Sequence, residues 1–299
     1  NVENNMVAHL SDWGKFQQTW TNQAYQTFKD LDKYIVLMYL SSNYWQNLSD
    51  KFEFLSMDEY HNKESVEINK INLIQISSYL NIPKETIRRK INELQKDNIL
   101  IREGKSIKFI RKATDLQKPL VTINLMSVFI EKKSNLLRGK KWFGEHITKE
   151  EIKIFIEKYY TIIWLRFFKL QIPYLIRNRN VFKDLETWII WGNLALNHQY
   201  HFKKKSEKNI INDRINMDNY FNRVVYSKVD YGINASSISD ISNIPRATVI
   251  RKLKWLVNQG VIKKTKKLEY VTNNQGKLAK KIKENFLNNH DAIAEFLTD

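Results

Sequence analysis

The stretch Asn81-Ile-Pro-Lys-Glu-Thr-Ile-Arg-Arg-Lys-Ile-Asn-Glu-Leu94 returns in related form 162 positions further along the chain. The second copy is Asn243-Ile-Pro-Arg-Ala-Thr-Val-Ile-Arg-Lys-Leu-Lys-Trp-Leu256. Two shorter matches precede it in the same order: Phe28–Leu31 with Phe182–Leu185, and Met57–Asn62 with Met217–Asn222. Three collinear matches indicate an internal duplication of a unit of roughly 110 to 120 residues, far longer than a solenoid repeat.

This duplication predicts two domains, which fits a chain of 299 residues. We expect a first unit over residues 1–119, a connector over 120–146 and a second unit over 147–299. The offset between the copies grows along the chain, so the second copy carries a short insertion, which we assign to the basic stretch 203–208.

The order of elements inside each copy is that of a winged helix-turn-helix. Only 8 glycines and 4 prolines occur, which favours helix. In the first copy the pattern predicts helices over 73–80 and 84–97, separated by the Asn-Ile-Pro turn, then strands over 99–101 and 107–110. In the second copy it predicts helices over 236–242 and 246–259, Gly260 at the helix end, and strands at 261–262 and 270–271. The expected fold class is therefore mainly α with small β wings, as two pseudo-symmetric winged helix-turn-helix domains joined by scaffold helices.

The scaffold helices have their own signals. Thr148 and Glu151 form a capping-box pattern ahead of an apolar helix that Pro173 should end or kink, and a last helix is expected over 276–296. Asp58 and Asp218, in the second repeated motif, are predicted to be helix caps. Core packing and the joint between the copies explain most of the aromatic residues on the scaffold: Tyr159, Tyr160, Trp164, Trp188 and Trp191.

Charge and composition favour an anionic partner. The net charge is +17, with 49 basic and 32 acidic residues, which points to nucleic acid or an acidic membrane surface. Absence of cysteine excludes disulfides and thiolate metal sites, and His198 and His201 alone have even a weak metal-ligand spacing, so we expect no metal and no cofactor. Neither a signal peptide nor a clean apolar span of about 20 residues occurs, so we expect a cytoplasmic protein without a membrane segment.

The stretch from Ile244 to Lys264 resembles the recognition helix and wing of bacterial winged-helix transcription regulators, particularly the MarR and GntR groups. The passage from Val271 through Gly276 is similar to the strand-to-last-helix segment of MarR proteins, where the last helix belongs to a dimer interface. The resemblance covers some 45 residues of the first copy and 60 of the second and implies DNA binding, with a small-molecule effector site between scaffold helices as a further expectation. The chain departs from the MarR pattern in its shorter wings and in carrying two such modules, so it would act as a pseudo-dimeric monomer or as a homodimer.

The candidate DNA contacts lie on the outward side of the two predicted recognition helices and on the wings. An α-helix fits the major groove, where arginine or lysine pairs with guanine and asparagine with adenine. Residues 84–105 include seven basic and four acidic side chains, and residues 246–267 include eight basic and none acidic. The predicted double-stranded DNA contacts are Lys84, Thr86, Arg88, Arg89, Asn92, Arg102, Lys105, Arg246, Thr248, Arg251, Lys252, Lys254, Lys263, Lys264, Lys266 and Lys267.

These features predict sequence-specific binding of double-stranded DNA by two recognition helices, and a role in transcription regulation. A replication initiator of the plasmid or phage type also uses paired winged helices, and winged helices in chromosome-organising complexes bind proteins instead. We expect no enzymatic activity, because no nucleotide-binding glycine loop, nucleophile elbow or paired-carboxylate motif occurs.

Overall fold

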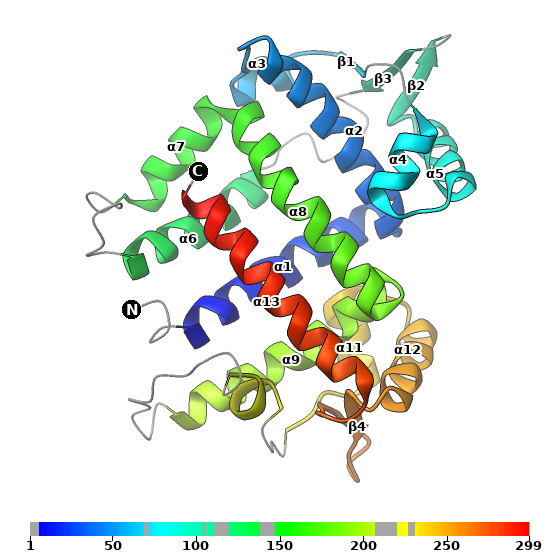
Figure 1. Ribbon diagram of the computed structural model, residues 1–299, viewed down its shortest axis with the longest axis vertical. Coiled ribbons are helices and arrows are strands. Elements are labelled where there is room, and N and C mark those ends of the chain that lie inside the picture. The colour runs from blue at the N-terminus through cyan, green and yellow to red at the C-terminus, as the bar shows by residue number, and fades with distance from the viewer. Residues whose placement is uncertain are drawn as a thin grey trace. The chain divides into compact units, whose positions relative to one another are not determined.

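The protein is mainly helical, with small antiparallel sheets (Figure 1). The computed structural model describes residues 6–68, 72–103, 106–110, 120–137, 147–206, 220–226 and 231–298. The described residues fall into two compact units. The first-copy unit lies within Asp30–Glu131, Ile147–Ile176 and Ala292–Asp299, and the second-copy unit lies within Asn1–Lys29, Lys132–His146 and Arg177–Asp291.

The first repeat forms two helices, a tight turn and a hairpin, preceded by a long scaffold helix. The strands of its sheet are antiparallel and lie in the order β1-β3-β2. Phe109 of β3 pairs with Val66 of β1 on one side and with Leu100 of β2 on the other. The elements in and leading into this unit are α2 (Leu31–Asp50), α3 (Met57–His61), β1 (Ser65–Ile68), α4 (Leu73–Leu80), α5 (Lys84–Lys96), β2 (Leu100–Glu103), β3 (Ser106–Ile110), α6 (Leu120–Leu137), α7 (Lys149–Lys158) and α8 (Tyr160–Phe182).

The second repeat has the same order of elements in its own unit. Its two strands pair antiparallel, with Ile262 opposite Thr272, and an isolated bridge joins Ile233 to Tyr270. The elements are α1 (Met6–Phe28), α9 (Leu185–Ser206), the π-helix η3 (Tyr220–Val225), α11 (Ala235–Ser242), α12 (Arg246–Asn258), β4 (Ile262–Lys264), β5 (Tyr270–Thr272) and α13 (Lys277–Thr298).

The packing units do not follow the boundaries expected from the sequence. Helix α1, which precedes the first copy in the chain, belongs to the second-copy unit, while α7 and most of α8 belong to the first-copy unit. The expected connector is largely helix α6, whose Ile123, Met126 and Phe129 are buried. The sequence repeat therefore locates the recurring helices and strands but not the helices that pack against them.

Helix ends follow local side-chain chemistry. The capping box of Thr148 and Glu151 at the start of α7 is confirmed. Asp58 is not a cap: Ser56 caps α3 together with Glu59, and Asp58 lies in the first turn. Asp218 lies outside the described residues.

Pro173 does not end its helix, which was one of the two outcomes expected of it, an end or a kink. Pro173 lies inside α8, and the chain instead breaks at Tyr159, between α7 and α8. Ile172, Leu175 and Leu170 are buried around Pro173, so burial of apolar surface outweighs the one helical hydrogen bond that proline removes.

Aromatic side chains fill the core of the first-copy unit. Trp45 of α2 lies 5.0 Å from Phe168 of α8 between ring centroids, and Tyr60 lies 5.5 Å from Tyr160. In the second-copy unit, Gly192 of α9 lets α1 approach closely, because a Cβ there would lie 1.9 Å from Nε2 of Gln18. The expectation that the scaffold tryptophans Trp164, Trp188 and Trp191 serve core packing agrees with their burial, and Tyr159 is only half-buried.

Among the described residues, no helix combines the length and the apolar character needed to cross a bilayer.

Helix α6 contributes a buried lysine to the second-copy unit. The side chain of Lys133, on α6, is almost fully buried, and its ammonium group lies 3.5 Å from Asp12 of α1. Burial lowers the pKa of Lys133 to about 8, and attraction by Asp12 offsets only part of that effect. The neighbouring Lys132 is half exposed.

We expect Lys133 to make the protein more stable in mild alkali. Between about pH 8 and pH 10.5 the unfolded chain holds a proton on Lys133 that the folded chain does not, so the free energy of unfolding rises with pH in this window. Each pKa unit corresponds to about 1.4 kcal/mol, so the rise amounts to a few kcal/mol at most. Urea unfolding across this window should show the rise in Lys132→Met, the matched control, but not in Lys133→Met. An equal pH dependence in both variants would contradict the assignment.

Candidate nucleic-acid interface

The turn between the two helices has the same local structure in both copies. Asn81 ends α4 and Asn243 ends α11 in the left-handed conformation, with φ of 51° and 58°. Asparagine tolerates this conformation better than other side chains apart from glycine. The hydroxyls of Ser77 and Ser239 donate to the carbonyls of Ile82 and Ile244, at 2.7 Å in both cases.

The helix that follows each turn has 13 residues in both copies and begins directly after a proline. Pro83 and Pro245 occupy the N-cap position and make no side-chain hydrogen bond there. At the other end, Asn98 and Gly260 occupy matching positions with φ of 56° and 74°. A Cβ at Gly260 would lie 2.7 Å from the carbonyl oxygen of Gln275, so glycine is required there by space as well as by conformation.

A buried lysine holds each of these helices against its scaffold helix. Lys90 of α5 donates to Asp30 at 2.6 Å, and Asp30 in turn accepts from the backbone N–H of Lys33 as the N-cap of α2. Glu93 contributes a second carboxylate at 2.9 Å. Burial alone would lower the pKa of Lys90, but the hydrogen bonds to Asp30 and Glu93 raise it overall, so Lys90 stays charged.

The second copy has the same arrangement with a different second carboxylate. Lys252 of α12 donates to Asp184 at 2.6 Å, and Asp184 accepts from the backbone N–H of Thr187 at the start of α9. The position that matches Glu93 holds Trp255, and Glu186 of α9 supplies the second carboxylate, 3.0 Å from the ammonium of Lys252.

The predicted DNA contact at Lys252 is therefore wrong. Its side chain is only 6% exposed and its ammonium is enclosed by two carboxylates, so it does not reach an external phosphate. A sequence signal for this existed: Lys252 lies three residues after Val249 and four before Leu256, both buried, and so falls on the inward face of the helix. Asp30 recurs as Asp184, and Lys90 recurs as Lys252. An ion pair between the two residues requires that both be kept in each repeat.

The remaining predicted residues of the second copy form a surface with no compensating carboxylate. Within the described part of the chain, no ion pair joins these side chains to Asp or Glu. Arg246 donates from Nε to the hydroxyl of Ser236, and Lys264 lies over the ring of Tyr270. Thr248 is half-buried, and the exposed basic residues, which we call the basic face, are Arg246, Arg251, Lys254, Lys263, Lys264, Lys266 and Lys267.

The first copy differs because acidic neighbours accompany its basic side chains. Arg88 pairs with Glu85, and Nε of Arg89 lies 3.7 Å from Glu93. On the hairpin, Lys108 pairs with Glu103 at 2.6 Å. Lys84 is exposed and Thr86 is half-buried, while Lys105 lies outside the described residues.

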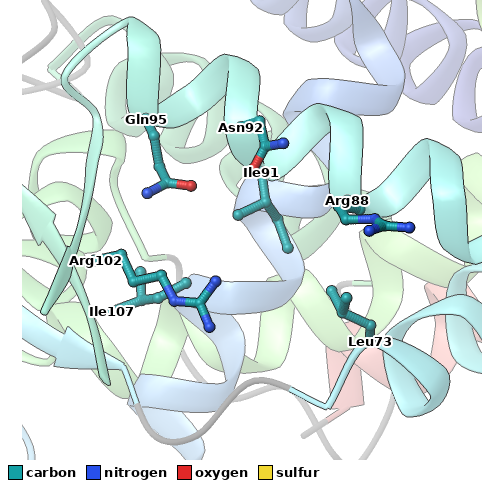
Figure 2. A pocket seen from close by; sticks show the side chains of 7 residues that line it. All are labelled: Leu73, Arg88, Ile91, Asn92, Gln95, Arg102 and Ile107. Atoms are coloured by element: carbon teal, nitrogen blue, oxygen red, sulfur yellow. The ribbon is translucent and has the colours of Figure 1, made fainter. Parts of the chain in front are cut away.

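A small pocket lies between α4, α5 and the hairpin of the first copy (Figure 2). Its volume is about 160 Å³. Figure 2 shows Ile91 projecting from α5 into the middle of the group, with Arg102 reaching toward it from β2. Three predicted DNA contacts are thus brought together here, and the lining residues are Leu73, Arg88, Ile91, Asn92, Gln95, Arg102 and Ile107. Gln95 was not among the predicted contacts, although it follows Asn92 and Arg88 on the same side of the helix.

The histidine pair has other partners. Nδ1 of His198 lies 2.7 Å from the hydroxyl of Thr272, and His201 stacks on Tyr231 with ring centroids 4.8 Å apart. Among the described residues, no group of three or more His, Asp and Glu side chains is placed to hold a metal ion.

Comparison with known proteins gave no match, neither to a protein-family model nor to a curated protein or solved structure.

Replacing Lys252 should lower stability, because Asp184 and Glu186 would lose their buried partner. We expect Lys252→Met to reduce the free energy of unfolding by roughly 1 to 3 kcal/mol, below the value for a fully buried pair since Asp184 is partly exposed. The matched control is Lys254→Met, an exposed lysine on the same helix, which should leave the thermal midpoint nearly unchanged. Calorimetry on both variants checks this, and equal midpoints would contradict the anchoring role.

Proposed function

We propose that the chain binds double-stranded DNA through two winged helix-turn-helix modules and acts as a transcription regulator. In this proposal α12 and α5 are the recognition helices, and the hairpins β4–β5 and β2–β3 are the wings. The order helix, turn, helix and hairpin, present in both copies, supports the fold assignment.

The basic face of the second copy is the single observation that carries the proposal. Seven exposed cations lie on one helix and the hairpin that follows it, with no acidic residue between positions 246 and 267. Such a cluster raises the electrostatic free energy of the isolated protein. The phosphates of a polyanion neutralise these cations, and the counterions released from the polyanion favour binding further. If the basic face had no binding partner, nothing would offset this electrostatic cost.

Regularly spaced phosphates suit this geometry better than an acidic protein patch does. A recognition helix in the major groove brings its outward side chains within reach of base edges and of the phosphates that flank the groove, and a wing beside it reaches the neighbouring backbone. Helix α12 offers Arg251 and Lys254 on its outward side, and the hairpin offers four lysines within five residues.

Binding should depend more on Arg251 than on Arg89, its counterpart in the first copy. Arg251 has no carboxylate partner among the described residues, whereas Arg89 lies near Glu93. Arg251→Ala should weaken binding to a long duplex about tenfold or more, and Arg89→Ala less than about threefold. Fluorescence anisotropy at one fixed salt concentration measures both. Equal losses would show that the carboxylates of the first copy do not matter.

Removing the wing cations should reduce the salt dependence of binding. For duplex DNA the logarithm of affinity falls with the logarithm of salt concentration by about 0.9 per phosphate contacted. Replacing Lys263, Lys264, Lys266 and Lys267 by alanine should flatten this slope by roughly 2 to 4. The matched control replaces Lys280 and Lys283 of α13, which lie outside the basic face. No binding of the wild-type chain to a long duplex at low salt would overturn the proposed function.

A further inference from the structure

The two copies carry different chemistry at matching positions of their recognition helices. Asn92 and Gln95 of α5 match Lys254 and Val257 of α12. Arg88 matches Ile250, and Arg102 on the hairpin matches Lys264. Amide groups on the first copy are thus replaced by a lysine and an apolar residue on the second.

We infer that the pocket of the first copy is a base-reading site for A·T pairs in the major groove, while the second copy supplies sequence-independent affinity for phosphates. This rests on the proposed function, because it names what each module would contact in duplex DNA.

The amides of Asn92 and Gln95 are the hydrogen-bonding groups of the pocket without a partner. Within the described part of the chain, neither side chain makes a hydrogen bond, and both line the same pocket. An amide matches adenine, since its oxygen accepts from N6 and its NH₂ donates to N7. Arg88, which would otherwise favour guanine, is already engaged by Glu85.

The floor of the pocket suits the other base of the pair. Leu73, Ile91 and Ile107 provide an apolar surface beside the amides, and Ile91 and Ile107 are buried. In the major groove the only apolar group on a base edge is the 5-methyl of thymine. Apolar and amide groups side by side therefore match an A·T pair, and a G·C pair would place a polar edge against the isoleucines.

The charges of the first copy also favour base reading over phosphate binding in this module. Each arginine of α5 lies close to a carboxylate, Glu85 or Glu93, which repels phosphates. Because these carboxylates weaken the general attraction of the first copy for DNA, its binding depends more on contacts with bases. Dependence on base contacts increases the discrimination between DNA sequences.

The test uses full-length protein and three long duplexes: alternating dA and dT, the same with dU in place of dT, and alternating dG and dC. Anisotropy at fixed salt should show preference for the first, with a loss of about fourfold on removing the thymine methyl. Asn92→Ala should abolish the preference over dG·dC. Lys254→Ala, at the matching position of the second copy, should weaken binding to all three duplexes equally. Circular dichroism confirms that both variants fold.

Several outcomes would overturn the inference. Equal affinity of the wild-type chain for the three duplexes removes base reading by this pocket but leaves DNA binding intact. A preference for dA·dT that neither dU nor Asn92→Ala changes would assign the selectivity to minor-groove shape instead. Absence of binding to every duplex would overturn the proposed function itself.

Discussion

The ammonium group of a buried lysine joins the second helix of each repeat to the N-terminus of a long scaffold helix. Lys90 and Lys252 each lie 2.6 Å from the aspartate that also caps that scaffold helix, so one carboxylate serves a backbone N–H and a side chain at once. The geometry fixes the rotation of α5 and α12 about their axes, because the lysine must point inward. Which residues point outward follows from that constraint.

The same buried contact between lysine and aspartate occurs in both repeats, but the exposed surfaces of α5 and α12 differ. On α12 every exposed charged side chain is a cation, whereas the outward side of α5 holds arginines near carboxylates, two amides and the edge of an apolar pocket. The two repeats thus share their internal polar contacts while their exposed residues differ. This difference is the reason for the separate DNA-binding roles that we propose for the two copies.

Sequence alone located most of the repeated elements, because their signals are local. The Asn-Ile-Pro turns, the 13-residue helices and the last helix lie where their patterns predict. Strand β1 was not predicted, since four residues flanked by polar positions give little alternation to detect. Pro173 does not end its helix, because burial of apolar side chains on both sides of it outweighs the local rule. Lys252 was misassigned because its partners Asp184 and Glu186 lie more than sixty positions away, and charge counts ignore such pairs.

Residues of the candidate site were also predictable only where the signal lies in the nearby sequence. Outward-facing Arg251 and Lys254 could be assigned from helical periodicity, whereas the pocket beside Asn92 requires knowing how β2 and β3 lie against α5. The assignment of α1 to the second-copy unit, and of α7 to the first-copy unit, has no signal in the repeat itself. Such packing depends on contacts between segments far apart in the chain.

We propose that the basic face of the second copy contacts DNA and that the buried Lys252 does not. Lysine acetylation followed by mass spectrometry, with and without a long duplex, tests this residue by residue. We expect DNA to protect Lys254, Lys263, Lys264, Lys266 and Lys267 from acetylation. Lys252, 6% exposed, should react slowly in both states, and the exposed Lys280 should react equally in both. Protection of Lys280 without protection of the hairpin lysines would contradict the account.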